Sequence, residues 1–449
     1  MNNETPSMCK CPFCFKEFLP ETAHFKAMTV FTEQDLDNDD FNSDMGDVVK
    51  KRFMERKDEK YDSFWANFPG SKPHFEYEKN PVIANYDKRY LDGLYKKDAD
   101  GFVNEAVDDQ QKSTKIRICP HCHNPLPFEF GKYPVKYIAV VGITSSGKTV
   151  YLAQLLGRFS ALLARADVTP VGMHDEADAF TKNHHVTKGE FLPGGNSSDN
   201  LTLPIPINIV NNKTKEHYTL IFYDIAGENC VKPDKMEKYG SFIKNADGIV
   251  MIVDPLQFNE LFSLPEGSDD TYSPEKVIQA MYNAFVSSQN SGDSSQKPLA
   301  AALSKSDILR GILEDNSNVF RNVDYKRHKK YGFLYDEWQD LNTELERLLA
   351  NRETVQGKLF TDQVNICFPN HGYFAVSALN CTPVEEDDVN GIKRYKLDED
   401  PEPLRIEEPL FWLLYRLGMI DGISRDDKVI MGGENGKKEK KQIFRFGRK

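Results

Sequence analysis

The feature that most constrains this chain is a glycine-rich turn between a strand pattern and a helix pattern. The sequence VKYIAVVG, residues 135–142, is short and almost wholly apolar, as expected of a strand buried on both faces of a parallel sheet. From Lys148 the sequence KTVYLAQLLGRFSALLA carries apolar residues at three-to-four spacing, which predicts an amphipathic helix. Strand, tight turn and helix therefore form the first unit of an α/β fold.

The turn itself, Gly142-Ile-Thr-Ser-Ser-Gly147-Lys148-Thr149, meets the pattern G-x-x-x-x-G-K-[ST] in full. Its glycines allow backbone N–H groups to surround phosphate oxygens, and the helix start adds the positive end of a dipole. Lys148 supplies a cation for the β and γ phosphates, and the Thr149 hydroxyl is a ligand for Mg²⁺. We therefore predict a nucleoside triphosphate site formed by Gly142, Ser145, Ser146, Gly147, Lys148, Thr149 and Val150.

Further strand and helix patterns alternate along the rest of the chain. This alternation predicts a doubly wound α/β sheet. We expect two stretches to be insertions in it, residues 167–200 and a charged helical segment at about 311–360. The predicted strands are 203–210, 217–224, 248–254, 298–304 and 372–378, and the predicted later helices are 274–288 and 407–419.

Charge and hydropathy limit the surroundings of the chain. A formal net charge of -12 disfavours broad adhesion to nucleic acid, except through a basic tail at residues 426–449, whose last fourteen residues carry seven bases and one acid. No apolar run approaches the roughly 18 residues that span a bilayer. The first residues show no signal pattern either, so we expect a soluble, cytoplasmic protein.

Two cysteine pairs at metal spacing lie far apart in the sequence. They are Cys11 with Cys14 in CPFC and Cys119 with Cys122 in CPHC. Two C-x-x-C turns provide the four thiolates of a tetrahedral zinc site, which has no open position and so serves the fold and not catalysis. Separate reduced thiols, or Cys9 as a substitute ligand, are the alternatives.

These pairs predict a structural Zn²⁺ in a zinc ribbon split between two segments, residues 1–20 and 115–130. Residues 21–114 then form an insertion, an acidic loop followed by an aromatic-rich segment.

Three later segments resemble, in the same order, motifs of Ras-like P-loop GTPases. Asp224-Ile-Ala-Gly227-Glu228 resembles the D-x-x-G switch. The resemblance implies that Asp224 holds Mg²⁺ through a water and that the Gly227 N–H senses the γ-phosphate. Glu228 departs from the family's usual glutamine, and a carboxylate near the γ-phosphate implies slow hydrolysis.

The other two segments resemble the family's base-reading motifs. Ser304-Lys305-Ser306-Asp307 is similar to [NT]-K-x-D, with Ser304 as a departure, and Ser377-Ala378-Leu379 is similar to the S-A-[KL] loop near guanine O6. An aspartate accepts two hydrogen bonds from guanine N1–H and N2–H₂, which adenine does not offer, so Asp307 favours GTP over ATP. A surface Lys-x-Asp pair is the alternative.

The family's switch I threonine is harder to place, because the segment before residue 203 is long. Thr202 is our choice, since it directly precedes the predicted strand 203–210, which in the family pairs with the strand ending at Asp224. Thr181 and Thr187 are alternatives, and so is an ordinary loop threonine.

The resemblance covers residues 131 to about 422 and implies a P-loop GTPase domain over 131–425. With the zinc ribbon and the segments SGKTVYLAQL, FYDIAGE and PLFWLLYRLG, the chain most resembles the bacterial double-GTPase family of conflict and defence systems, whose members are thought to act in pairs or with partner proteins. The implied function is a GTP/GDP-dependent switch that hydrolyses GTP with Mg²⁺ and reports to a protein partner. Its catalytic residues would be Lys148, Thr202, Gly227 and Glu228.

Two other functions remain open on the residues alone. One is a scaffold that binds GTP and scarcely hydrolyses it, which the glutamate at position 228 and the long insertions favour. The other is an ATP-using P-loop ATPase or kinase.

Overall fold

The structure, a computed structural model, describes residues 8–28, 57–68, 70–84, 95–108, 111–142, 145–173, 175–193, 201, 203–231, 233–258, 273–286, 296–351, 355–387 and 393–433. The chain divides into two compact units. Unit 1 comprises residues 1–135 and 199–204, and unit 2 comprises residues 136–198 and 205–449. The boundary thus falls a few residues after the predicted one at 130, and the acidic loop of the insertion lies outside the described residues.

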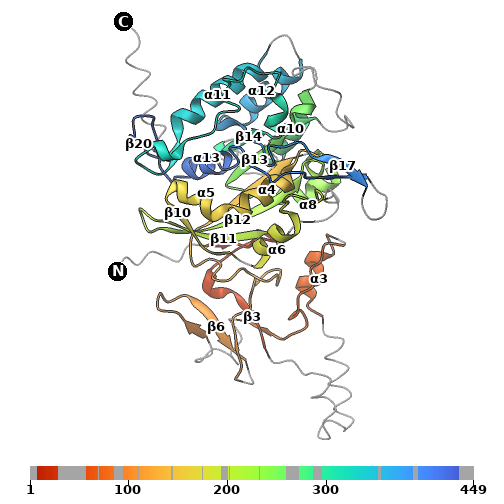
Figure 1. The fold of residues 1–449 in the computed structure, drawn as a ribbon. Coiled ribbons are helices and arrows are strands. Elements are labelled where there is room, and N and C mark those ends of the chain that lie inside the picture. The colour runs from red at the N-terminus through yellow and green to blue at the C-terminus, as the bar shows by residue number, and fades with distance from the viewer. Residues whose placement is uncertain are drawn as a thin grey trace, which may run out of the picture. The chain divides into compact units, whose positions relative to one another are not determined.

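Unit 2 is built on a seven-stranded sheet in the order β10-β11-β12-β9-β13-β14-β16 (Figure 1). The strands β9, β13, β14 and β16 run parallel, in a register that pairs Val250 with Val140 and with Ala300. Their carboxyl ends therefore meet at one edge of the sheet. The seven strands are β9 Val135–Gly142, β10 Val168–Met173, β11 Ile205–Asn211, β12 His217–Ala226, β13 Gly248–Val253, β14 Leu299–Leu303 and β16 His371–Ala375.

The sheet is mixed and not purely parallel. The strands β10, β11 and β12 form consecutive antiparallel pairs at one side of it. A five-residue turn of polar residues, 212–216, joins β11 to β12, and so short a connection can only link antiparallel strands. The expected pairing of the strand after Thr202 with the strand ending at Asp224 is confirmed, with Ile207 opposite Leu220.

Within the stretch 167–200, expected to be an insertion, strand β10 and helix α6, Asp175–His184, contribute to the core of unit 2. Strand β10 is the edge strand of the sheet, where Pro170 is tolerated because the outer side of an edge strand needs no backbone donor. Helix α6 buries Ala177 and Phe180 in the main core cluster. A strand of six residues containing proline and glycine gives too weak a pattern to be recognised in advance.

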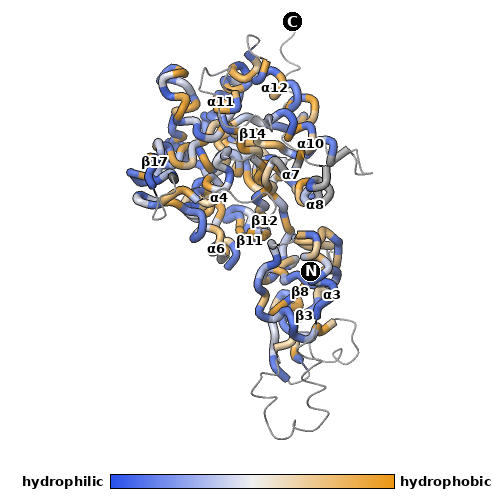
Figure 2. Tube along the Cα trace, turned by 90° about the vertical axis from the view of Figure 1, so that its right-hand side faces the viewer, coloured by the Kyte–Doolittle hydropathy of each residue, from blue (hydrophilic) through white to orange (hydrophobic). Residues whose placement is uncertain are grey.

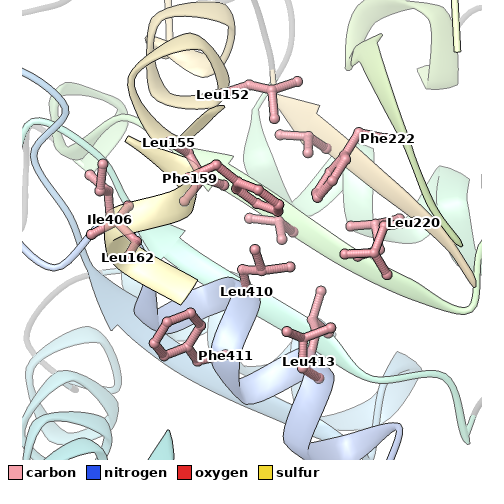
Figure 3. Packing of buried hydrophobic residues seen from close by; sticks show 14 of the residues in the cluster. Leu152, Leu155, Phe159, Leu162, Leu220, Phe222, Ile406, Leu410, Phe411 and Leu413 are labelled. Carbon is pink, nitrogen blue, oxygen red and sulfur yellow. The ribbon is translucent and has the colours of Figure 1, made fainter. Parts of the chain in front are cut away.

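Helices cover both faces of the sheet, as the doubly wound expectation requires. On one face α4, Lys148–Gly157, and α5, Phe159–Leu163, pack with α13, Glu408–Arg416, against strand side chains such as Leu220 and Phe222 (Figure 3). On the other face Tyr223 contacts Phe242 of α8, and Tyr373 contacts Phe360 of α12. In Figure 2 the apolar residues gather along central strands such as β14, which is the pattern of strands buried on both faces.

The remaining helices of unit 2 lie between the strands in sequence. The predicted helix from 148 is interrupted at Arg158, and the segment expected to be helical at 311–360 becomes helical only at Tyr335. The helices α10, α11 and α12 lie side by side. The bounds are α7 Glu228–Val231, α8 Pro233–Lys244, α10 Pro274–Val286, α11 Tyr335–Leu349 and α12 Val355–Cys367, with 3-10 turns η4 Ala164–Ala166, η5 Pro255–Phe258, η7 Ser306–Leu309 and η8 Tyr325–Arg327.

Two small sheets complete unit 2. One consists of β15, Phe333–Leu334, β19, Gly422–Ile423, and β20, Val429–Ile430. Strand β20 lies within the predicted tail 426–449, so the regular structure extends further than expected; residues 434–449 lie outside the described residues. The other is the hairpin of β17, Val384–Asp387, and β18, Lys393–Lys396.

Among its described residues, unit 1 contains short strands and the α-helix α3, Glu59–Trp65. Its sheets are β1-β2, β4-β3-β8 and β5-β6-β7. Their bounds are β1 Cys9–Lys10, β2 Glu17–Phe18, β3 His24–Lys26, β4 Val82–Ile83, β5 Tyr95–Lys97, β6 Val103–Val107, β7 Ser113–Thr114 and β8 Arg117–Ile118, with the 3-10 turn η1 Pro20–Thr22. In the described parts of both units, no helix has the length and apolar character needed to cross a membrane.

Candidate functional site

The glycine-rich loop follows β9 directly and leads into α4 at Lys148. A Cβ on Gly142 would lie 2.6 Å from Ser146 Oγ and 3.0 Å from the Ile252 carbonyl oxygen, so only glycine fits there. Gly147 has φ +80° immediately before the helix, a conformation that favours glycine. Ser146 is buried, whereas Ser145 is exposed and Val150 is half-buried at the start of α4. Residues 143 and 144 lie outside the described residues.

Three side chains predicted to handle phosphate and metal are brought together. The Lys148 ammonium forms an ion pair with the carboxylate of Asp224, whose side chain is fully buried. The Thr149 hydroxyl donates a 2.9 Å hydrogen bond to the other oxygen of the same carboxylate. Strand β12 lies next to β9, and this adjacency places Asp224 beside the first turn of α4.

The Gly227 N–H, which is expected to sense a γ-phosphate, has a partner within the protein. In the structure this N–H donates a 2.9 Å hydrogen bond to the carbonyl oxygen of Gly142. Contact with a phosphate would require this hydrogen bond to be exchanged. The backbone of Glu228 begins α7, and its side chain lies outside the described residues.

Ser304 links the strand of the predicted base-reading motif to the glycine-rich loop. Its hydroxyl lies 2.7 Å from the Ser146 carbonyl oxygen and 3.2 Å from that of Val253, and the residue is buried. A hydroxyl donates one proton, and the shorter contact is to Ser146. The departure at Ser304 from the family's usual residue thus still supplies a donor to the loop.

Lys305 has an anchor that the sequence reasoning missed. Its ammonium lies 2.6 Å from the carboxylate of Asp254, which is buried and follows β13. Its Cε lies 4.0 Å from where a Cβ on Gly147 would be, so the lysine stem runs close to the glycine-rich loop. The available signal is an aspartate directly after the buried strand β13. Its relevance to Lys305, which follows β14, depends on the adjacency of β13 and β14 in the sheet.

Asp307 and the loop at residues 377–379 also lie together. The Ser377 hydroxyl donates a 2.5 Å hydrogen bond to the Asp307 carboxylate and accepts one of 2.8 Å from the Asn380 N–H. Asp307, Ala378 and Leu379 are half-buried, while Ser377 is buried. The carboxylate is thus held by a buried hydroxyl and remains partly accessible, as a hydrogen-bond acceptor for a ligand must be.

The threonines considered for switch I have different surroundings. Thr181 lies within α6 and donates to the Ala177 carbonyl oxygen, and Thr187 donates to Glu190. Thr202 lies outside the described residues. Both alternatives therefore have local partners, and Thr202 stays a prediction.

The four cysteines of the C-x-x-C turns form one cluster in unit 1. Their sulfurs, from Cys11, Cys14, Cys119 and Cys122, all lie within 4.8 Å of one another. The distance is 3.7 Å between Cys11 and Cys122 and 3.8 Å between Cys14 and Cys119. Zn–S bonds of about 2.3 Å place the sulfurs of a tetrahedron about 3.8 Å apart, so the spacing fits a metal ion with thiolate ligands.

The two turns have the same backbone geometry. In the first, the Phe15 N–H donates to the Cys11 carbonyl oxygen and Phe15 has φ +56°. In the second, the His123 N–H donates to the Cys119 carbonyl oxygen and His123 has φ +54°. Two equivalent turns from distant parts of the sequence therefore face one point.

Cys9 is outside this cluster. Its thiol donates to the Phe18 carbonyl oxygen at 3.5 Å. Burial, only partly offset by the charge of Arg117, raises the pKa of the Cys9 thiol to about 12. Because the Cys9 sulfur is not among the four sulfurs that lie within 4.8 Å of one another, the structure does not support the alternative that placed Cys9 in the metal site.

No protein-family model matches the chain. The putative ESX-1 scaffolding and assembly protein SaeC of Mycolicibacterium smegmatis is 25% identical over 268 residues, which make up 52% of this chain and 64% of that protein. The match therefore spans less than two thirds of the relative's length.

Three solved structures of GTP-binding or related proteins are similar at low identity. A GTP-binding protein from Sulfolobus solfataricus in complex with GDP is 14% identical, over 54% of this chain and 47% of that chain, with a TM-score of 0.23. The bacterial selenocysteine-specific elongation factor EF-Sec is 13% identical over 55% and 26%, with a TM-score of 0.22. A septin GTPase domain from Chlamydomonas reinhardtii is 12% identical over 63% and 92%, with a TM-score of 0.26. TM-scores this low do not establish a shared fold.

Proposed function

We propose that this chain binds GTP together with Mg²⁺ at the carboxyl edge of the seven-stranded sheet. The observation that carries the proposal is the convergence of four strand ends on one edge. Lys148 and Thr149 follow β9, Asp224 lies near the end of β12, and Asp307 follows β14, with the 377–379 loop after β16 bonded to it. Phosphate-binding, metal-binding and base-reading groups thus share one location, as a nucleotide requires.

The loop supplies the phosphate contacts in this proposal. Lys148 would exchange its ion pair with Asp224 for contacts with phosphate oxygens. The triphosphate carries more negative charge than one carboxylate and would bind the ammonium more strongly. Ser146 Oγ is buried and has no hydrogen-bond partner in the part of the chain that the structure describes, so it has a donor to offer a ligand. The N-terminus of α4 adds backbone N–H groups directed at the same place.

Thr149 and Asp224 would hold the magnesium ion. Both offer oxygen ligands, and their oxygens already lie 2.9 Å apart. Hard oxygen donors are the ligands that Mg²⁺ prefers, and the ion would neutralise charge on the β and γ phosphates. Asp224 would act through a water, and Thr202 remains the second proposed direct protein ligand.

Asp307 would select guanine. A carboxylate accepts hydrogen bonds from guanine N1–H and N2–H₂, and Ser377 fixes its orientation. Adenine bound in place of guanine would leave the carboxylate without donors, which costs more than a missing contact.

Calorimetric titration of the full chain with GTP, GDP and ATP in Mg²⁺ tests the binding proposal. We expect GTP and GDP to bind at least about 100-fold more tightly than ATP. Asp307→Asn should weaken GTP by about 10-fold to 100-fold and should improve binding of xanthosine triphosphate, whose C2 carbonyl accepts from the new amide. Tight ATP binding that Asp307→Asn leaves unchanged would instead support the ATP-using alternative.

We further propose that the bound GTP is hydrolysed and that the Gly227 segment changes its contacts with the nucleotide state. The Gly227 N–H is bonded to Gly142, so a γ-phosphate that captures this donor would pull the start of α7 with it. Glu228 implies slow turnover, because its charge opposes that of the γ-phosphate. The full chain should release phosphate from GTP in Mg²⁺ slowly, at a rate that a protein partner raises.

A second candidate is a GTP-dependent scaffold with little turnover. The similarity to SaeC, whose name describes a scaffolding and assembly protein, favours a protein partner for this chain. Glu228→Gln separates the two candidates. A rise in the hydrolysis rate of about tenfold, equivalent to about 1.4 kcal/mol in the barrier, supports the enzyme. An unchanged, negligible rate supports the scaffold. Membership of the double-GTPase family of defence systems, with action in pairs, also stays a proposal.

For unit 1 we propose a structural zinc ion bound by Cys11, Cys14, Cys119 and Cys122. The sulfur spacing supports four-coordinate binding, and four protein ligands would leave no position for substrate. Metal analysis of the purified chain should find one zinc per chain, which Cys119→Ser lowers.

A further inference from the structure

We infer that helix α3 holds the metal cluster of unit 1 in its working geometry, and that Asn124 is the positioning residue through which it acts. This inference rests on the proposed metal binding. It adds that the metal's affinity depends on a helix about sixty residues away in the sequence, and that the docking of this helix depends on the metal.

Asn124 contacts the cluster and the helix at the same time. Its amide nitrogen donates a 3.3 Å hydrogen bond to the sulfur of Cys122, and its amide oxygen accepts a 2.8 Å hydrogen bond from the indole nitrogen of Trp65. Asn124 is fully buried, and Trp65, the last residue of α3, is almost so. The two bonds fix which end of the amide faces the sulfur.

The equivalent position in the first turn shows that the fold of the turn does not require asparagine. Both turns close with a backbone hydrogen bond from their first cysteine to the residue five positions later, which is Lys16 in one and Asn124 in the other. Lys16 is exposed. The buried amide at position 124 is therefore explained by its contacts with Cys122 and Trp65 and not by the turn.

An amide donor matters here because a zinc ion with four thiolates carries a net charge of -2. A hydrogen bond to a buried thiolate stabilises that charge, and hydrogen bonds to charged groups are stronger than neutral ones. The groups that orient metal ligands from outside typically change metal affinity by about 10-fold to 100-fold when they are replaced.

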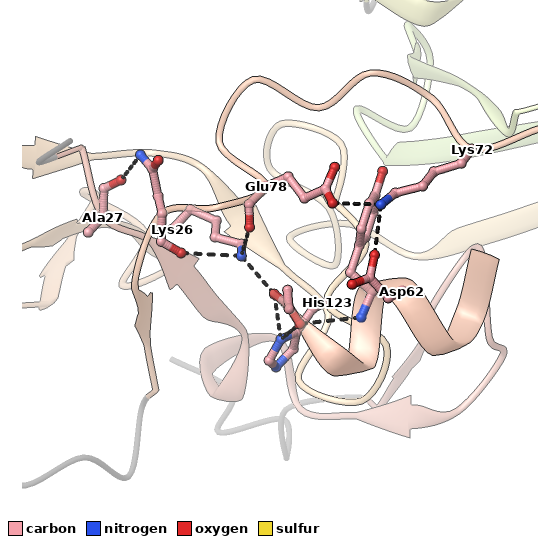
Figure 4. A network of polar contacts seen from close by, with 9 residues as sticks. Lys26, Ala27, Asp62, Lys72, Glu78 and His123 are labelled. Carbon is pink, nitrogen blue, oxygen red and sulfur yellow. Dashed lines mark hydrogen bonds and ion pairs between the residues drawn. The ribbon is translucent and has the colours of Figure 1, made fainter. Parts of the chain in front are cut away.

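The other end of α3 contacts the same turn. Asp58 caps the helix by accepting from the Tyr61 N–H, and its carboxylate lies 2.8 Å from His123 Nδ1 and 2.7 Å from the ammonium of Lys26 (Figure 4). Lys26 also donates to the carbonyl oxygen of Glu78. His123 is the residue directly after Cys122 and Asn124 is the next, so the two ends of α3 hold the two residues that follow one metal ligand.

The helix contacts both turns. The Phe13 ring, between the first two cysteines, lies edge-on to the rings of Phe64 and Trp65, with centroids 6.0 and 6.2 Å away. On the second turn, Lys60 donates to the Pro120 carbonyl oxygen at 2.9 Å. A single helix thus joins the two halves of the metal site.

Because the contacts are shared, the coupling works in both directions. If docked α3 raises the affinity for the metal by some factor, the metal stabilises docked α3 by the same factor. The metal site would then control the docking of α3, the helix that follows the acidic segment of the insertion. The metal would thus have a role beyond joining the two C-x-x-C turns.

The test uses the full chain and two conservative variants. Asn124→Asp keeps the size and the acceptor for Trp65 but removes the donor to Cys122, while Trp65→Phe keeps the aromatic packing but removes the indole N–H. Lys16→Ala, at the equivalent position of the other turn, is the control. Trp338→Phe is the control for the loss of an indole, because its nitrogen has no hydrogen-bond partner in the part of the chain that the structure describes.

Zinc content of the wild-type chain is measured first, and a chain that binds no metal would end the metal proposal itself. Competition with a chromophoric chelator then gives affinities. We expect Asn124→Asp to lower zinc affinity by about 10-fold to 100-fold and Trp65→Phe by a few-fold, with both controls unchanged. Cobalt substitution gives a second readout, because the thiolate-to-cobalt absorption band should shift in Asn124→Asp and not in Lys16→Ala.

Hydrogen exchange of residues 59–65 tests the reverse direction. Removing zinc from the wild-type chain should raise exchange in α3, and Asn124→Asp should show raised exchange even with zinc bound. Wild-type zinc affinity in Asn124→Asp, or α3 protection that does not respond to metal removal, would overturn the inference while leaving zinc binding intact.

Discussion

The hydroxyl of Ser304 donates a 2.7 Å hydrogen bond to the carbonyl oxygen of Ser146. Ser304 follows β14 and Ser146 lies in the loop after β9, with β13 between the two strands in the sheet. The bond therefore reaches across one strand and joins the proposed base-reading segment to the proposed phosphate loop. A residue that appears in the sequence only as a departure from a motif is a structural link between the two halves of the site.

Ser304→Ala should weaken the binding of GTP and of GDP by a similar factor, about 5-fold. The reason is that one net hydrogen bond contributes about 1 kcal/mol and its loss leaves the Ser146 carbonyl without this donor. Calorimetry measures both affinities. Ser306→Ala is the control, because the Ser306 hydroxyl is buried and has no partner among the described residues. Equal effects of the two substitutions would contradict a role for the Ser304 bond.

Gly142→Ala should abolish nucleotide binding or reduce it by more than about 10-fold. The new Cβ would lie 2.6 Å from Ser146 Oγ and 3.0 Å from the Ile252 carbonyl oxygen, so the loop must move away from the neighbouring strand. Shifts of this kind cost about 1–3 kcal/mol. Far-UV circular dichroism and the melting temperature show whether the sheet stays folded. An alanine variant that is folded and binds GTP normally would show that the loop does not need this close approach.

Asp254→Asn should weaken nucleotide binding by a few-fold, because Lys305 loses the carboxylate that holds its ammonium at 2.6 Å. The effect is modest, since the lysine side chain is 37% exposed and water screens the pair. The control is the same substitution at Asp421, whose carboxylate lies 2.6 Å from the Lys213 ammonium. This ion pair is not part of the proposed site. Filter binding or calorimetry measures the affinity of Asp254→Asn and of Asp421→Asn for GTP. An equal loss of affinity in Asp421→Asn would contradict the prediction.

Unit 1 should lose stability as the pH falls from about 6.5 towards about 4. Burial, followed by the charge of His123, lowers the pKa of His24 to about 4, while an unfolded histidine has a pKa of about 6.5. Between these values the unfolded chain binds more protons, so stability rises with pH across this window and is constant outside it. The full change is about 3 kcal/mol.

The measurement is the melting temperature of the first unfolding transition at pH 7.5, 5.5 and 4.5, with bound zinc determined at each pH. His24→Phe keeps a buried ring of similar size and removes the proton, so its transition should depend less on pH than that of the wild type. Identical pH dependence in the two proteins would assign the effect to the metal ligands and not to His24.

Local sequence patterns predicted the elements whose cause is local. The run from Val135 to Gly142 is a strand with the expected bounds because its six residues from Tyr137 to Gly142 are buried and have no stable place outside a sheet core. Gly147 is needed where φ is positive, and the C-x-x-C turns repeat one backbone geometry wherever they occur. Motif and spacing predicted Lys148 and Asp224, which form an ion pair, Asp307, which is bonded to Ser377, and the four cysteines, whose sulfurs lie together.

The elements that were missed depend on neighbours distant in the sequence. Strand β10 is a strand because β11 offers it an edge, and nothing within Val168–Met173 specifies that partner. Asp254 anchors Lys305 only because β13 and β14 are adjacent in the sheet.

The sequence by itself determined the glycine-rich loop, the two cysteine turns and the positions of the main strands along the chain. Each of these follows from dihedral preferences and burial within a few residues. Only the tertiary structure decided that Ser304 bonds to Ser146, that Asp254 holds Lys305 and that Trp65 reaches Cys122 through Asn124. Those pairings depend on which strands and helices become neighbours, and hydrogen bonds between such neighbours leave no periodic pattern in the chain.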